Sequence, residues 1–230
     1  MYRKLEDLFI CIKNSIRFCL GKNYITSLEE AYYFTVRKFG HKLTLSDVHF
    51  PIEQCPLDDL RTAVSFIDSY IREQGEFNIA LRCNIVCMDI HDKLKSKYNI
   101  DSIITSGDLR LNGRAIWTTT RKQLATQFGH TIPVMSHHVW LTIGEFIIDP
   151  TVLFTIRQRS PHLLSKAIYD ETHMIFLCEY KYRTMYLGNL SFEYKPRLVG
   201  REFYEHTRYG TPFLSIFCRP PAAVQGGPEV

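Results

Sequence analysis

The stretch "SHHVWLTIGEFIIDPT", residues 136–151, joins two apolar runs that carry histidines at the front and an aspartate near the end. An apolar hairpin normally keeps ionisable groups off its buried face, because desolvating such a group costs several kcal/mol unless it is paired. Gly144 and Glu145 match a two-residue turn of type II′, which prefers glycine at its first position. The stretch therefore predicts a β-hairpin whose histidines and aspartate need a physical justification.

The register of this hairpin follows from the turn. Ile143 lies opposite Phe146, and the same register places Trp140 opposite Asp149. Opposite residues share a sheet face and alternate residues return to it, so His138, Trp140 and Asp149 project to one side. His138 and Asp149 become diagonal neighbours roughly 7 Å apart between backbones, which allows an imidazole and a carboxylate to meet.

A carboxylate that accepts the imidazole N–H offsets the cost of burial and fixes the tautomer, while the other ring nitrogen stays free. His138 and Asp149 in this arrangement are typical of the second and third members of a nucleophilic triad. The alternative is a buried pair that only stabilises the hairpin. His137 is expected to point to the opposite face of the strand.

Cys83 is the candidate nucleophile, in the helical stretch that precedes the β-rich half. Cys83, Cys87, Ile90 and Leu94 share one helical face by their spacing. If the helix begins near Arg82, the Cys83 thiol lies at the positive end of the helix dipole, beside free N–H groups that favour a thiolate and can bind an oxyanion. If the helix instead begins at an Asn78 N-cap, Cys83 lies a full turn inside it and is a structural thiol.

The order Cys, His, Asp on helix, strand and strand resembles the transglutaminase-like branch of the papain-like cysteine enzymes. The matching segments are Cys83 with "MDIHDKLKSKYNIDSIITSG", "HVWL" after His137, and "IDPT" around Asp149. The resemblance covers about residues 78–153, a third of the chain. It implies catalysis by Cys83, His138 and Asp149 without a cofactor or metal. The chain departs from the family in its lead-in "NIALRC", which has no glycine nearer than Gly75.

Three further residues are candidates for substrate contacts. An oxyanion hole usually adds a side-chain donor to the N–H of the nucleophile, and the available amides before Cys83 are Gln74 and Asn78. Either residue is alternatively a solvated loop or cap residue. Trp140 is a candidate wall of the acyl site, or alternatively a simple core residue.

The overall pattern predicts an α+β protein. We expect a papain-like, transglutaminase-like core in which N-terminal helices pack on an antiparallel sheet, because a helical half is followed by short β-branched and aromatic runs. We expect one domain over residues 1–218, with a helical part at 1–75, the cysteine helix and sheet at 76–218, and a disordered Pro- and Gly-rich tail at 219–230.

The sequence predicts three helices in the first part of the chain. The first has an amphipathic stripe at Leu5, Phe9, Ile12 and Ile16. The second begins with a capping box at Ser27 and Glu30 and ends at Gly40, and the third lies between Pro56 and Gly75. The expected strand segments are "SIITSGDLRL", "RAIWTTT", "VMSHHVWLTI", "EFIIDPTVLF", "HMIFLCEYKY" and "LSFEYK".

Composition limits the possible partners and compartments. The net charge is +4, from 28 basic and 24 acidic residues, and the basic residues are scattered, so we expect no nucleic-acid partner. The seven cysteines form no CxxC pair, which indicates neither a disulfide framework nor a metal site. No apolar run is long enough for a membrane span. We expect a cytoplasmic protein, with export by a dedicated secretion system as the alternative; the oligomeric state is left open.

These features together predict a cysteine-dependent acyl-transfer enzyme that acts on amide bonds of a protein or peptide substrate. Transfer to water would make it a cysteine protease or glutamine deamidase, and transfer to an amine a transglutaminase. The residues do not choose between these acceptors. The alternative from another functional class is a catalytically inactive member of the same fold that acts as a protein-binding module.

Overall fold

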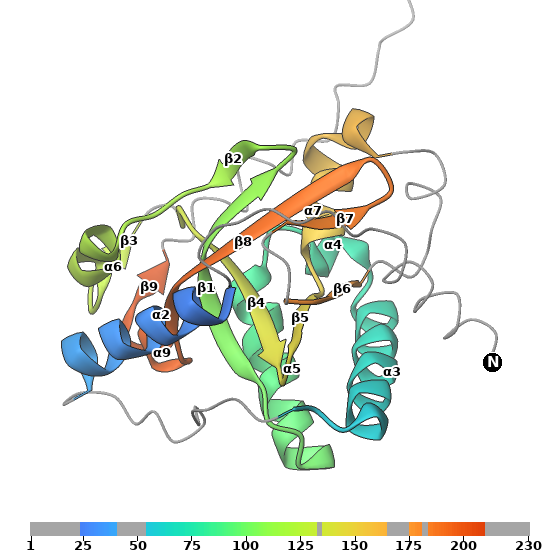
Figure 1. Cartoon of the computed structure of the whole chain (residues 1–230), viewed down its shortest axis with the longest axis horizontal. Coiled ribbons are helices and arrows are strands. Elements are labelled where there is room, and N and C mark those ends of the chain that lie inside the picture. The colour runs from blue at the N-terminus through green and yellow to red at the C-terminus, as the bar shows by residue number, and fades with distance from the viewer. Residues whose placement is uncertain (1–23, 41–53, 133–134, 165–174, 181–183, 210–230) are drawn as a thin grey trace, which may run out of the picture.

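The structure is a computed structural model that describes residues 24–40, 54–132, 135–164, 175–180 and 184–209. The predicted stripe from Leu5 to Ile16 and the predicted tail at 219–230 lie outside these residues. Helices dominate the first part of the described chain, and strands follow (Figure 1). The helical segments are α2 (Tyr24–Phe39), α3 (Leu57–Gln74), α4 (Glu76–Ile79), α5 (Cys83–Tyr98), α6 (Arg121–Gln127), α7 (Val152–Arg159), the 3₁₀ turn η1 (Pro161–Leu163) and α9 (Glu202–His206).

Most described strands belong to one antiparallel sheet of seven strands, in the order β6-β5-β4-β1-β8-β7, with β2 pairing the end of β1. A second, two-stranded sheet pairs β3 with β9 in parallel. The chain is therefore α+β with an antiparallel main sheet, as the sequence predicts. The strands are β1 (Ile103–Leu111), β2 (Arg114–Trp117), β3 (Thr131–Ile132), β4 (His138–Ile143), β5 (Phe146–Asp149), β6 (Phe176–Glu179), β7 (Met185–Leu187), β8 (Leu190–Val199) and β9 (Arg208–Tyr209).

The main sheet curls until it is nearly closed. Its two edge strands approach each other, since Cys178 Sγ on β6 lies 2.8 Å from Met185 Sδ on β7. Phe176 on β6 also packs on Phe192 of β8, with ring centroids 4.4 Å apart. The curl gives the sheet an enclosed face, and the aromatic side chains on this face form much of the core.

Two helices pack against this sheet at different strands, α5 at β4 and α2 at β8 (Figure 1). The first residue of α2, Tyr24, places its hydroxyl 2.6 Å from Thr142 Oγ1 and accepts the Trp140 indole N–H at 2.8 Å. Every residue of β4 is buried, because α5 and the enclosed core each cover part of it. This double burial explains why the sequence of β4 is apolar on both faces apart from its histidine and threonine.

The β4–β5 hairpin has the predicted register. Ile143 pairs with Phe146 and Leu141 with Ile148, and the turn between them is Gly144 and Glu145. Gly144 has a φ of +50°, as a type II′ turn requires at its first position. The prediction of this hairpin is confirmed.

The predicted helix boundaries are partly wrong. The helix predicted between Pro56 and Gly75 is α3, which begins after Pro56 and ends before Gly75 as expected. Gly40 follows the end of α2, also as expected. The capping box is wrong, because Ser27 lies inside α2, which already includes Tyr24. The strand predicted over "EFIIDPTVLF" ends at Asp149, and its last residues form α7, because Pro150 removes a ladder donor and the Asp149 carboxylate satisfies N–H groups at the helix start.

The turn glycine offers a direct test of the hairpin's packing. A Cβ on Gly144 would lie 2.5 Å from the Cys55 backbone nitrogen, and the residue also has positive φ. We expect Gly144→Ala to lower the free energy of unfolding by about 3 kcal/mol or more, since strain of about 1–2 kcal/mol adds to the clash. Urea denaturation measures the change.

Gly113→Ala is the matched control. Gly113 has a φ of +74° but nothing within 4 Å of the added Cβ, so it should cost only the conformational term, about 1–2 kcal/mol. Equal losses for the two variants would contradict the close packing of the Gly144 turn on residue 55.

Candidate active site

Cys83 is the first residue of α5, and Arg82 is its N-cap. Asn78 belongs to the separate helix α4, so the alternative in which Asn78 caps the cysteine helix is wrong. No side chain caps α5, and the N–H groups of its first turn have no acceptor within the helix. The Cys83 thiol therefore lies at the end of a helix where backbone donors and the dipole favour negative charge.

The loop before Cys83 makes its turn without a glycine. Leu81 has a φ of +63°, a left-handed conformation that costs a residue with a Cβ about 1–2 kcal/mol. Its backbone N–H donates to Thr155 Oγ1 of α7 at 3.2 Å. Leu81 thus makes the sharp entry into the helix that a glycine would make more cheaply, and α7 helps to hold the strained conformation.

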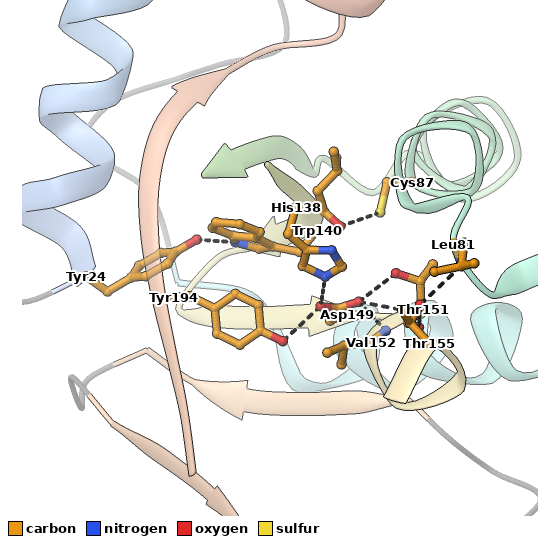
Figure 2. Close-up of polar contacts among 11 residues, drawn as sticks. Tyr24, Leu81, Cys87, His138, Trp140, Asp149, Thr151, Val152, Thr155 and Tyr194 are labelled. Carbon is orange, nitrogen blue, oxygen red and sulfur yellow. Dashed lines mark hydrogen bonds and ion pairs between the residues drawn. The ribbon is translucent and has the colours of Figure 1, made fainter. Parts of the chain in front are cut away.

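The His138 imidazole and the Asp149 carboxylate meet as the register predicts. His138 Nε2 lies 2.5 Å from Asp149 Oδ2, and both side chains are almost fully buried, at 1% and 0% exposure (Figure 2). Because Nε2 is bonded to Asp149, Nδ1 is the ring nitrogen that remains available for a further hydrogen bond. Nδ1 has no hydrogen-bond partner of acceptable geometry among the described residues.

The Asp149 carboxylate is saturated with donors. Oδ1 accepts the backbone N–H groups of Thr151 and Val152, both at 3.0 Å, and the Thr151 hydroxyl at 3.1 Å. Oδ2 accepts the Tyr194 hydroxyl at 2.8 Å in addition to His138 (Figure 2). Burial alone would raise the pKa of Asp149, but the His138 charge and these hydrogen bonds hold it below its usual value.

The electrostatic surroundings favour a charged His138. Burial opposes the imidazolium, but the negative charge of Asp149, the electrostatic interaction with Cys83 and the hydrogen bond with Asp149 raise the pKa of His138 from 6.5 to about 10. Cys83 is thus near enough to the ring to change its protonation. The structure brings Cys83, His138 and Asp149 into one cluster, with the histidine in the middle.

Aromatic side chains surround the imidazole. Trp117 on β2 stacks on His138 with ring centroids 4.6 Å apart. Trp140 also stacks near His138, with ring centroids 6.2 Å apart, and is fully buried with its indole N–H donating to Tyr24. Trp140 is thus a packed core residue next to His138, and among the residues described Trp117 is the partly exposed aromatic wall of the site.

Gly107 lies directly opposite His138 in the pairing of β1 with β4. A Cβ at Gly107 would lie 2.0 Å from the Lys195 carbonyl oxygen of β8, and the β1–β8 register shifts between Ser106 and Gly107. The glycine that ends the "SIITSG" run therefore permits the close approach of β8, the strand that brings Tyr194 to Asp149.

His137 points away from the cluster, as predicted. Its Nε2 lies 3.1 Å from the Tyr204 hydroxyl, and its ring packs edge-on against Phe203. Burial and the neighbouring His138 charge lower the pKa of His137 to about 3. Adjacent histidines on opposite faces of one strand thus have opposite shifts, because only His138 has a carboxylate partner.

Cys87, Asn78 and Gln74 complete the residues that the sequence placed near the nucleophile. Cys87 is fully buried one turn deeper in α5, its thiol donates to the Val139 carbonyl at 3.5 Å, and burial raises its pKa well above the usual value. Asn78 Nδ2 donates to the Gln74 carbonyl at 2.9 Å, and both residues are exposed. That contact joins α3 to α4 and leaves the proposed oxyanion role of both amides a prediction.

Sequence reasoning missed Tyr194 and Trp117. Tyr194 reaches Asp149 from β8, 45 positions along the chain, and no local pattern reports such a pairing. The run "RAIWTTT" marked Trp117 as a strand residue but carried no sign that it faces His138.

Comparison of the chain with models of protein families, with curated proteins and with solved structures finds no match. The resemblance to transglutaminase-like enzymes therefore stays a prediction.

Across the described residues no group of three or more His, Cys, Asp and Glu side chains is arranged to hold a metal ion. None of the described helices is both long enough and apolar enough to cross a bilayer.

The two histidines predict a stability maximum near pH 6.5. The raised pKa of His138 stabilises the fold fully below 6.5, and this contribution is lost as pH rises toward 10. The lowered pKa of His137 has the opposite sign, so its contribution is lost as pH falls from 6.5 toward 3. Urea denaturation between about pH 4 and pH 9 should show a free energy of unfolding that falls on both sides.

Single variants separate the two sides of this curve of unfolding free energy against pH. His138→Gln should remove the fall above pH 6.5 and keep the fall below it. His137→Gln should remove the fall below pH 6.5 and keep the fall above it. The readout is the slope against pH, so a uniform loss of stability in either variant does not obscure it. Wild-type slopes in both variants would contradict the assignment.

Proposed function

We propose that the protein is a cysteine-dependent acyl-transfer enzyme that acts on amide bonds of a protein or peptide. The observation that carries the proposal is the position of Cys83 at the first residue of α5, next to a histidine whose pKa is raised by both Cys83 and Asp149. A thiol beside an imidazolium and a helix N-terminus has the surroundings in which cysteines react as thiolates.

The first chemical step is attack of the Cys83 thiolate on the carbonyl carbon of the amide. The oxyanion that forms accepts hydrogen bonds from the uncapped N–H groups of the first turn of α5. As the C–N bond breaks, the His138 imidazolium gives its proton to the departing amine, and a thioester on Cys83 remains.

The second step returns the enzyme to its starting state. Water or an amine attacks the thioester carbonyl and gives a proton to His138, and the Cys83 thiolate leaves. Asp149 keeps its negative charge throughout and fixes the imidazole through Nε2, so it acts as an orienting and charge-stabilising group. Water as acceptor makes the enzyme a protease or glutamine deamidase, and an amine makes it a transglutaminase.

The proposal includes a papain-like, transglutaminase-like arrangement of helix and sheet. It is supported by the chain order of Cys83, His138 and Asp149 and by the elements that carry them, α5, β4 and β5. Four described cysteines are free thiols, which agrees with a protein that works in a reducing cytosol.

A second candidate function is a protein-binding module that keeps the cluster without catalysis. Burial favours it, because Cys83 is 5% exposed and His138 1%, so a bulky substrate must approach through a narrow opening. In this case Asp149 and His138 only stabilise the fold.

Thiol labelling separates the two functions. We expect iodoacetamide at about pH 6 to alkylate Cys83 at least tenfold faster than free cysteine under the same conditions, as measured by mass spectrometry. Cys55 is the more exposed thiol, but burial and the charges of Asp59 and Glu145 raise its pKa to about 11, so it is a slow internal control that should stay largely unlabelled. Asp149→Asn and His138→Gln should each remove most of the advantage of Cys83.

A Cys83 that reacts no faster than free cysteine would contradict the enzymatic proposal and favour the binding module. The reaction itself is identified by incubating wild type and Cys83→Ala with a proteome and scoring cleaved, deamidated and cross-linked proteins. Cys87→Ala is the matched control, because it removes a thiol from the same helical face and should retain activity if it folds.

A further inference from the structure

A small apolar pocket lies beside the candidate active site. Its volume is about 70 Å³, and it lies between β1, β2, α7 and η1. Most of its lining residues are aliphatic or aromatic, and the polar ones come from α7 and the residue that follows it. The lining residues are Leu109, Leu111, Ile116, Trp117, Val152, Thr155, Ile156, Arg159, Ser160 and Leu163.

Three lining residues connect the pocket to the catalytic cluster. The Trp117 ring stacks on His138, and the Val152 backbone N–H donates to Asp149. Thr155 Oγ1 accepts the backbone N–H of Leu81, two positions before Cys83. The wall of the pocket is thus attached to each part of the cluster, and Figure 2 shows Leu81, Thr155 and Val152 gathered beside Asp149.

Size and lining limit what the pocket can bind. An apolar cavity of roughly 150 Å³ accepts benzene, so a cavity of about 70 Å³ is too small for an aromatic ring and fits a branched aliphatic side chain. Ile116 at its edge is 45% exposed, so the pocket opens to the surface and a substrate can enter from outside. Burying an aliphatic group there removes apolar surface from water on both sides of the contact.

We propose that this pocket is a specificity site that binds a branched aliphatic side chain of the substrate, of the size of Val, Leu or Ile, next to the amide that Cys83 attacks. The proposal rests on the proposed function. In this proposal Trp117 has two roles. Its indole ring packs on the imidazole of His138 and also forms part of the wall that contacts the bound side chain.

The test uses three alkylating reagents on the full chain: iodoacetamide, N-isobutyl iodoacetamide and N-benzyl iodoacetamide. Rates at Cys83 are divided by the rates of the same reagents with free cysteine, which removes differences in intrinsic reactivity. In the wild type the isobutyl reagent should gain about tenfold over iodoacetamide, and the benzyl reagent should gain nothing.

Ile116→Ala provides a gain that misfolding cannot imitate. It enlarges the pocket at its open edge, so the ratio of the benzyl rate to the iodoacetamide rate should rise several-fold above that of the wild type. Leu57→Ala is the matched control, since Leu57 is an exposed aliphatic residue on α3 at 58% exposure and does not line the pocket. It should behave as the wild type.

The failures of the two proposals are distinguishable. If iodoacetamide alkylates Cys83 rapidly but the three normalised rates are equal in wild type and Ile116→Ala, the specificity site is wrong and the proposed function stands. If iodoacetamide itself reacts slowly at Cys83, the proposed function is wrong, and the pocket loses its role as a substrate site.

Discussion

The buried contact between His138 and Asp149 is the interaction on which the rest of the site depends. Two ionisable groups with almost no exposure face each other at 2.5 Å, and removing one partner of such a pair typically costs about 3–5 kcal/mol. The fold offsets the burial by supplying further donors, from the Thr151 and Val152 backbone and the Tyr194 hydroxyl. An anion so well stabilised can hold a neighbouring imidazole in its charged form.

This requirement explains features of the architecture that are otherwise unrelated. Pro150 ends β5 directly after Asp149, so that the next backbone N–H groups turn toward the carboxylate and begin α7. Gly107 lets β8 approach β1 closely, and β8 carries Tyr194. Thr155 on α7 then holds the strained loop at Leu81, which fixes the start of the cysteine helix. The Asp149 carboxylate on β5 thus contacts side chains of β4 and β8 and the start of α7, and α7 in turn holds the loop before the candidate nucleophile.

The sequence predicted the parts of this site that depend on local chemistry. The turn at Gly144 allows only one pairing register for β4 and β5, and side chains alternate between the two faces of each strand. These two facts were enough to predict that His138 and Asp149 lie side by side. The helix start was open between Asn78 and Arg82, because its determinant is a left-handed Leu81 held by Thr155, a contact between segments 74 positions apart. Tyr194 and Trp117 were missed for the same reason, and Ser27 was misplaced because a capping-box pattern also occurs inside helices.

The most direct measurement of the central claim is the titration of His138 by nuclear magnetic resonance in protein with nitrogen-15 labelled histidine. We predict that His138 stays protonated on both ring nitrogens at pH 7.5 and loses its proton near pH 10, and that Cys83→Ala shifts this titration to lower pH, because Cys83 is one of the groups that raise the pKa of His138. A His138 that titrates near pH 6.5, unchanged by Cys83→Ala, would contradict the account.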